Sequence, residues 1–494
     1  MRNGVVSKPS NLFRYILLLA LALRCIHIFS PTIGDNSWRQ SDTAAMARNF
    51  YENGFNFFYP QIDWGGTSEG YVETEFPLYP FLVALLYKVF DVHEFIGRLL
   101  SVVCSLITIW VSFRLVKKIF DEPTALWASF FLSILPFVVY YSRNFFPEPM
   151  MVMMIVLGVY FFLRWIESDH WLDFLLSAFF TALACLLKIP SLYIGLPLFF
   201  LSYQKYQWRS FRNVNLYVYT LIVFVPVALW YSHAHNIFLQ SGLSFGIWEY
   251  GSDKWGNWNL LTTWNFWNSI IFRNLAEKHF TWFGFPVLII GFFLHRNSRL
   301  EYLFDYWIAA LMIYVLIVAK GNFVHAYYQL PFLVPCSVFM AKVYAKYFIV
   351  EGQKRKVNLL LSFTLAGIII FSAWRIGSLM ERENINASPE FELASMMKQK
   401  TPAGSRIVVI DRNDPTIFYL AHRKGWHASP SDMTMEFLAS HAIDGQWYLA
   451  GVFDYLDVDQ KKEIMILIES SNVVWKNERS FIITMPQSIV QKKS

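Results

Sequence analysis

The sequence FIGRLLSVVCSLITIWVSFRLV, residues 95–116, decides the fold class, because an apolar helix of about 20 residues can cross the hydrocarbon core of a bilayer. The chain of 494 residues is 55% hydrophobic and only 16% charged, whereas a soluble domain carries about 25% charged residues. We therefore expect an α-helical polytopic membrane protein with about eleven transmembrane helices. The predicted spans cover residues 12–30, 95–116, 124–141, 149–166, 171–188, 190–204, 214–232, 282–295, 302–319, 328–349 and 357–375.

The distribution of lysine and arginine between the spans predicts the orientation of the chain. With the amino terminus in the cytoplasm, the inside connections hold basic clusters such as Lys117 and Lys118, whereas the short outside connections hold few basic residues. This orientation places the first loop (31–94), a long loop (233–281) and the carboxyl-terminal region outside. The apolar segment Phe76–Phe90 is short for a crossing, so we expect it to be re-entrant or interfacial. We expect a multi-pass protein of the cytoplasmic (inner) membrane and no nucleic-acid partner.

The composition becomes more polar after about Arg375, which predicts a separate domain at the carboxyl end. Residues 406–411 read Arg-Ile-Val-Val-Ile-Asp, the pattern of a buried strand, and Asn413-Asp414-Pro415 predicts a turn after it. We therefore expect a transmembrane domain over residues 1–375 and a small extracytoplasmic α/β domain over residues 376–494.

The first outside loop carries carboxylates and an arginine at the boundary of the apolar layer. If a helix begins at Asn36, then Asp35, Arg39 and Asp42 share one face of it, because they are spaced i, i+4 and i, i+3. The alternative is a solvated ion-pair face, or Asp35 as the helix N-cap. Glu75 stands just before a Phe-Pro pair, where it could equally be a solvated charge at a helix start.

Further polar residues are predicted on the same side of the membrane. Glu148 stands between two prolines, which favours a stiff turn. Lys188 ends a helix, where its ammonium could hold a lipid phosphate or snorkel to the interface. His325 precedes a late helix and could bind a phosphate or, with carboxylates, a divalent metal, and His279 is a weaker candidate of the same kind. Ionisable groups gathered at one membrane boundary favour a functional interpretation.

The candidate residues follow one another in a characteristic order. An Asp-bearing loop follows the first span, and Glu75 precedes a Pro-Leu helix start. An acidic Pro turn at Glu148 precedes the fourth span, Lys188 precedes the sixth, and Tyr328-Gln329-Leu330-Pro331 starts a late helix. This order resembles the GT-C-fold glycosyltransferases, in particular the group that joins dolichyl-phosphate-mannose protein mannosyltransferases to the lipid A aminoarabinose transferase. The resemblance covers about the first 350 residues.

The resemblance implies catalytic and positioning roles for four carboxylates. Asp35 matches the family's acceptor-activating aspartate by its place after the first span, and Asp42 competes because it opens a segment resembling the first juxtamembrane helix. Glu75 and Glu148 resemble acidic positioning residues. The chain departs from the family in having Glu75-Phe76-Pro77 where the aminoarabinose transferases have an acidic-Lys-Pro-Pro run. Asp35 is followed by Asn36 where the mannosyltransferases have an adjacent acidic pair, so neither sugar nor acceptor is predicted.

The donor phosphate is expected to meet a second group of residues. The resemblance implies that Lys188 contacts the phosphate, with His325 and Tyr328 near it, and Arg39 suits a phosphate by its guanidinium fork. A divalent metal is a candidate cofactor, with Glu75 and His279 as candidate ligands.

These observations lead to one hypothesis and one rival. We expect inverting transfer of a monosaccharide from a polyprenyl-phosphate donor to a hydroxyl of an extracytoplasmic lipid, glycan or protein acceptor. The partners are then the lipid-linked sugar, the membrane lipid and an acceptor that the sequence does not identify. The alternative is a multi-pass lipid or sugar transporter or flippase, which predicts ionisable residues near the bilayer midplane and two related halves.

Overall fold

The computed structural model describes residues 11–246, 255–256, 258–348, 355–428 and 447–484. The chain divides into two compact units. The first comprises residues 1–28, 98–233 and 246–378, and the second comprises residues 29–97, 234–245 and 379–494. Parts of two predicted regions lie outside the described residues, namely 247–254 and 257 of the long loop, and 429–446 and 485–494 of the carboxyl-terminal domain.

Most helices belong to the first unit, and they are rich in apolar residues. Among the described residues, five helical stretches are long and apolar enough to cross a membrane: α4, α7, α10, η5 with α14, and α17. The predicted membrane class agrees with this, and the count of eleven spans stays a prediction.

The helices are α1 (Asn11–Cys25), α4 (Glu94–Ile119), α5 (Glu122–Ile134), α6 (Pro136–Tyr141), α7 (Glu148–Ser168), α8 (Trp171–Leu187), η1 (Ile189–Ile194), α9 (Gly195–Tyr206), η2 (Gln207–Arg212), α10 (Val214–Ser241), α11 (Trp258–Leu261), α12 (Trp264–Trp267), η4 (Asn268–His279), α13 (Thr281–Phe293), η5 (Arg299–Tyr302), α14 (Leu303–Ile317), α15 (Ala319–Val324), η6 (Ala326–Phe332), α16 (Leu333–Tyr347) and α17 (Arg355–Glu381).

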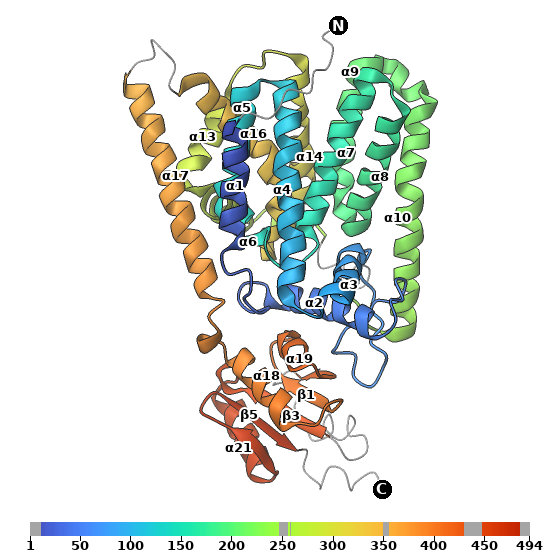
Figure 1. The fold of residues 1–494 in the computed structure, drawn as a ribbon, viewed down its shortest axis with the longest axis vertical. Helices are drawn as coiled ribbons and strands as arrows, with labels where there is room; N and C mark the ends of the chain where they lie inside the picture. Colours follow the sequence, from blue (N-terminus) through green and yellow to red (C-terminus); the bar gives the residue numbers. More distant parts are fainter. Residues whose placement is uncertain (1–10, 247–254, 257, 349–354, 429–446, 485–494) are drawn as a thin grey trace. The chain divides into compact units, whose positions relative to one another are not determined.

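Helices α7, α8 and α10 lie side by side in this unit (Figure 1). Glu148 and Pro149 begin α7, where a carboxylate and a proline suit the first helical turn. Gly158 lets α8 approach α7 closely, because a Cβ at this position would lie 2.6 Å from Thr181 Oγ1. Tyr219 of α10 shares a hydrogen bond of 2.8 Å with the same Thr181 hydroxyl. These contacts fix α8 against both α7 and α10.

The span predicted over 124–141 is divided into α5 and α6. Pro136 has no N–H to continue the helix, so the break exposes carbonyl groups at the end of α5. The buried guanidinium of Arg24 donates hydrogen bonds to the carbonyls of Leu132 and Ser133, at 2.9 and 3.1 Å, and to the Ser105 hydroxyl at 2.9 Å. The buried Arg24 thus donates hydrogen bonds to carbonyl groups that the helix cannot pair where Pro136 interrupts it.

The second unit combines the first loop with the carboxyl-terminal domain. Its sheet has the strand order β2-β1-β3-β5-β4, in which β2, β1 and β3 are parallel and β5 is antiparallel to β3 and β4. The elements are α2 (Ser37–Glu52), α3 (Leu78–Phe90), η7 (Ile385–Ala387), α18 (Pro389–Lys400), β1 (Arg406–Ile410), α19 (Thr416–Ala421), β2 (Lys424–Ala428), β3 (Trp447–Val452), η9 (Phe453–Tyr455), α21 (Val458–Glu469), β4 (Val473–Lys476) and β5 (Ser480–Thr484).

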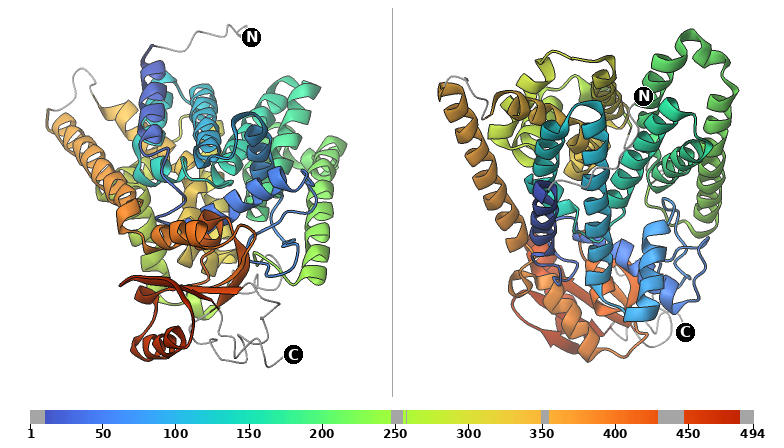
Figure 2. Two further views of the ribbon diagram at one scale, coloured as in Figure 1. Left: turned by 60° about the horizontal axis from the view of Figure 1, so that its bottom comes forward. Right: turned by 45° about the horizontal axis from the view of Figure 1, so that its top comes forward.

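Both faces of this sheet are covered by helices, as Figure 2 shows. Val408 and Ile410 of β1 pack on the side of α21, whereas Ile407 and Val409 pack on the side of α18 and α19. The alternation follows from the two-residue period of a strand. The strand predicted at 406–411 is confirmed, and the carboxyl-terminal region contains a small sheet of parallel and antiparallel strands with helices.

The first loop is attached to the edge of this sheet. The Gly425 N–H of β2 donates to the Asp63 carbonyl at 3.0 Å, and the Gly66 N–H donates to the Gly425 carbonyl at 2.7 Å. Gly66 has a φ of 66°, and a Cβ there would collide with the Trp426 ring, so only glycine fits. These bonds cover the unpaired edge of β2 and tie the first loop to the carboxyl-terminal domain.

Candidate active site

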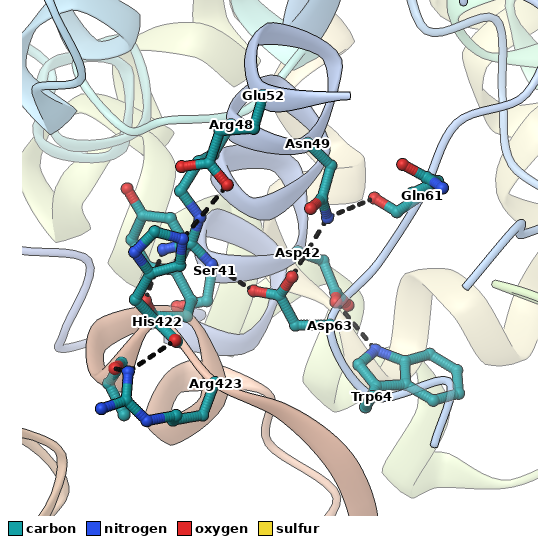
Figure 3. A network of polar contacts seen from close by, with 12 residues as sticks. Ser41, Asp42, Arg48, Asn49, Glu52, Gln61, Asp63, Trp64, His422 and Arg423 are labelled. Carbon is teal, nitrogen blue, oxygen red and sulfur yellow. Dashed lines mark hydrogen bonds and ion pairs between the residues drawn. The ribbon is translucent and has the colours of Figure 1, made fainter. Parts of the chain in front are cut away.

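Asp42 lies on α2 in the second unit and is almost completely buried, with 4% of its surface exposed. Its Oδ1 accepts a hydrogen bond of 2.9 Å from Trp64 Nε1 (Figure 3). Burial raises the pKa of Asp42 to about 7; the Trp64 hydrogen bond and electrostatic interactions with His427 and Arg39 oppose this rise, and Asp414 adds to it. A carboxyl group with a pKa near neutrality can accept a proton from a substrate at physiological pH.

Trp64 is held in place because residues 61 and 63, which precede it, form polar contacts with α2. Arg48 of α2 forms a buried ion pair with Asp63, at 2.5 Å. Asn49 donates hydrogen bonds of 3.1 Å to Asp63 Oδ1 and to the Gln61 carbonyl (Figure 3). Residues 61–64 are therefore fixed against α2, and the indole N–H is directed to Asp42.

Arg39 lies one turn before Asp42 on α2 and binds Glu75. The two groups form an ion pair of 2.9 Å, with the arginine side chain only 7% exposed. Arg39 and Asp42 share the helix as predicted, and Glu75 neutralises the arginine.

Asp35 differs from Asp42 in position and environment. Asn36 has a left-handed φ of 58° and occupies the N-cap position, so Asp35 lies outside the helix. The expectation that Asp35 shares a helix face with Arg39 and Asp42 is therefore wrong, and so is Asp35 as the N-cap. Its carboxylate forms an ion pair of 2.5 Å with Arg382 and remains 26% exposed.

The first unit holds Lys188 and Glu148 as a buried ion pair. Lys188 Nζ lies 2.9 Å from Glu148 Oε1, and the two side chains are only 9% and 1% exposed. The same ammonium lies 4.1 Å from the ring centre of Tyr328 and 5.1 Å from that of Tyr327. Lys188 caps the carboxyl end of α8 and Glu148 begins α7, so each charge also faces the helix end of opposite polarity. Carboxylate, helix end and aromatic faces together stabilise the cation.

An apolar cavity lies in the same unit and is lined by the residue that follows Lys188. Its volume is about 400 Å³, and it is lined on one side by Ile189, the residue after Lys188. Tyr314 also lines it and donates a hydrogen bond of 3.2 Å to the Tyr328 carbonyl. The His325 ring lies 5.4 Å from the rings of both Tyr327 and Tyr328. The cavity lining includes Ile189, Pro190, Tyr193, Trp255, Tyr314 and Val318.

The candidate metal ligands have other contacts. Glu75 binds Arg39, and His279 Nε2 lies 3.0 Å from the Ala326 carbonyl, to which it donates. Over the part of the chain that the structure describes, no three His, Cys, Asp or Glu side chains are grouped in a way that could hold a metal ion. These residues do not fit a metal site as they stand, and the mechanism below has no step through a metal.

The structure thus groups the predicted residues in two sets. Arg39, Asp42 and Glu75 belong to the second unit, and Glu148, Lys188, His325 and Tyr328 belong to the first. The sequence did not indicate Trp64 or His427 as neighbours of Asp42. The one available signal was the polar run Asp411-Arg412-Asn413-Asp414 directly after a buried strand, since the carboxyl ends of parallel strands commonly carry functional groups.

Comparison with known proteins identifies the fold. Residues 74–231 match the family model described as dolichyl-phosphate-mannose-protein mannosyltransferase. The crystal structure of ArnT from Cupriavidus metallidurans bound to undecaprenyl phosphate is similar over 98% of this chain and 99% of that chain, with a TM-score of 0.69 and 12% sequence identity. The Archaeoglobus fulgidus oligosaccharyltransferase complex with Zn and sulfate is similar over 90% of this chain and 68% of that chain, with a TM-score of 0.57 and 14% identity.

A search of the curated proteins gives no match. The family-model match and the similar structures nevertheless agree: the chain has the GT-C glycosyltransferase fold, and the resemblance expected from its sequence is confirmed.

Proposed function

We propose that the protein is a glycosyltransferase of the cytoplasmic membrane that transfers one monosaccharide from a polyprenyl-phosphate donor to a hydroxyl of an extracytoplasmic acceptor. The observation that carries this proposal is the buried Lys188–Glu148 ion pair, which packs against two tyrosine rings. Ile189, the residue after Lys188, lines an apolar cavity, and a cation and an apolar surface at neighbouring positions suit a ligand with an anionic head and a hydrocarbon tail. The ArnT structure, whose fold this chain shares, contains undecaprenyl phosphate, which has this chemistry.

Lys188 is the proposed contact of the donor phosphate. The negative charge on the phosphate rises as the sugar leaves, and a fixed cation stabilises that charge in the transition state. Glu148 holds the ammonium in place, and His325 and Tyr328 contribute the polar edge of the site. The ring of Tyr328 covers one side of the ammonium, which restricts its access to water.

Asp42 is the proposed general base. As the acceptor oxygen attacks the anomeric carbon, its O–H proton passes to the Asp42 carboxylate. The bond between the anomeric carbon and the phosphate oxygen breaks, and its electron pair leaves with the polyprenyl phosphate. One displacement of this kind inverts the configuration at the anomeric carbon. The environment of Asp42 supports this role better than that of Asp35, which is exposed and bound to Arg382.

The test uses purified protein in liposomes that contain a panel of undecaprenyl-phosphate monosaccharides. Release of undecaprenyl phosphate is measured for the wild type, Asp42→Asn and Lys188→Met. We expect turnover with at least one donor and its loss in both variants. Absence of turnover with every donor would contradict the proposal and favour the transporter alternative. Full activity of Asp42→Asn would reject the assignment of the base.

A further inference from the structure

His427 of the carboxyl-terminal domain contacts Trp64, the residue that donates a hydrogen bond to the proposed base, Asp42. Its imidazole is 5.5 Å from the ring centre of Trp64, whose N–H donates to Asp42. The imidazole also lies 4.9 Å from Phe418 between ring centres, in an edge-to-face arrangement. His427 therefore contacts two aromatic rings, and one of them, Trp64, is bonded to Asp42.

Asp411 fixes this histidine by a hydrogen bond. His427 Nδ1 lies 2.9 and 3.0 Å from the two Asp411 carboxylate oxygens, so the ring N–H donates to the carboxylate. Asp411 is itself oriented by the Asn413 N–H, which donates to its Oδ1 at 2.8 Å. The Asp411 side chain is almost completely buried, so it has little freedom to move. An aspartate that accepts a hydrogen bond from one nitrogen of a histidine fixes the orientation of the ring.

The place of this pair in the fold also points to a functional role. Asp411 follows β1 and His427 lies near the end of β2, so both occur at the carboxyl ends of adjacent parallel strands. In α/β domains this edge commonly carries the functional groups. Here α2 is bonded to the same edge, because the Ser37 hydroxyl donates to Asp414 at 2.8 Å.

We propose that His427, held by Asp411, is a positioning residue for acceptor activation, which it supports by packing Trp64 so that the indole N–H stays on Asp42. The carboxyl-terminal domain is then part of the catalytic apparatus. This inference rests on the proposed function only in taking Asp42 as the base. The packing it describes exists whether or not the enzyme uses a lipid-linked donor.

The charges around Asp42 give the inference a second, electrostatic consequence. Electrostatic interactions with Arg39 and His427 favour the Asp42 carboxylate, whereas the interaction with Asp414 opposes it. Asp411 in turn faces His427. Removal of His427 takes away one group that lowers the pKa of Asp42, so that pKa rises. A general base works only when it is deprotonated, so the acidic limb of the pH–rate profile moves to higher pH.

A matched control is available in the same domain. His422 also contacts a carboxylate, Glu52 Oε2, at 3.1 Å, but both side chains are exposed. His422→Gln removes a histidine–carboxylate contact of the same type and leaves the Asp411–His427–Trp64 contacts in place. A general loss of domain stability would affect both histidine variants, whereas a positioning effect is confined to His427.

The experiment compares full-length wild type, His427→Gln, Trp64→Phe, His422→Gln and Asp42→Asn in liposomes, with the undecaprenyl-phosphate monosaccharide that the wild type turns over. We expect His427→Gln and Trp64→Phe to lower kcat about tenfold or more, to leave the donor KM unchanged and to shift the acidic limb to higher pH. His422→Gln should behave as the wild type. An unchanged kcat and pH profile in His427→Gln, with Asp42→Asn inactive, would overturn this inference and leave the proposed function standing.

A second measurement does not depend on turnover. Thermal unfolding of Trp64→Phe, His427→Gln and the double variant forms a double-mutant cycle for two side chains in contact. We expect non-additive shifts in melting temperature, because each variant removes part of the same packing. Additive shifts would overturn the inference even if the enzyme is active. If the shifts are non-additive but no donor is turned over, the contact between Trp64 and His427 is supported and the proposed function is rejected.

Discussion

Replacing Lys188 by Met should both destabilise the protein and stop sugar transfer. At 2.9 Å and an effective dielectric constant of about 20, the attraction between the two charges is about 6 kcal/mol, most of which offsets their desolvation. Removing one partner leaves Glu148 charged, buried and only 1% exposed. The expected loss of stability is about 3–5 kcal/mol.

The double variant Lys188→Met/Glu148→Gln separates stability from catalysis. It removes both charges, so most of the lost stability should return, because a buried pair replaced by neutral groups is often nearly neutral in energy. Transfer should nevertheless stay at least about 100-fold below the wild type, because no ammonium faces the departing phosphate. The exposed pair Lys205–Asp169 serves as the control, and Lys205→Met should change stability by less than about 1 kcal/mol.

Thermal unfolding in detergent and release of undecaprenyl phosphate in liposomes are measured on the same preparations. A double variant that recovers stability and also transfers sugar at the wild-type rate would refute the role of Lys188 at the phosphate. A single variant as stable as the wild type would refute the buried ion pair itself.

Four further predictions concern the second unit and the metal. Asp42→Asn should lower kcat by about 10² to 10⁴, and Asp35→Asn by less than tenfold, in the same transfer assay. The pKa of Asp42 near 7 predicts that kcat/KM falls as the pH drops through about 7. Its raised pKa also predicts that Asp42→Asn is more stable than the wild type, by an amount that grows as the pH rises from about 4 to about 7 and is constant above that, because the wild type must bury a charge; this is checked by thermal unfolding at pH 4 to 9. Chelation with EDTA should leave sugar transfer unchanged, because Glu75 forms an ion pair with Arg39 and His279 Nε2 is hydrogen-bonded to the Ala326 carbonyl. A loss of activity that is restored by added divalent metal would contradict this prediction.

The fold class could be predicted because its signals are local. The length and apolar character of spans such as 95–116 depend only on neighbouring residues, and so does the buried strand at 406–411. The division of the span at 124–141 was missed, because the consequence of Pro136 depends on Arg24 from another helix. Single apolar stretches therefore predict helices better than they predict where a helix is interrupted.

The environment of Asp42 could not be predicted from the sequence. Trp64 lies 22 residues from it along the chain, and His427 contacts Trp64 only because the first loop binds the edge of β2. Asp35 and Asp42 look alike as aspartates in one polar loop, and the family resemblance matched Asp35 by its place after the first span. Burial distinguishes the two. Asp42 is buried, which raises its pKa, whereas the Asp35 side chain is 26% exposed.

The departure of this chain from the aminoarabinose transferases has a structural counterpart. Those proteins place a lysine directly after the acidic residue, whereas here Phe76 follows Glu75. The cation beside Glu75 is instead Arg39, which reaches it from α2 at a distance of 2.9 Å. This cation lies on the same helix as Asp42, one turn before it. Its positive charge favours the carboxylate form of Asp42. Because Glu75 holds Arg39 in place, Glu75 is linked through Arg39 to the proposed base.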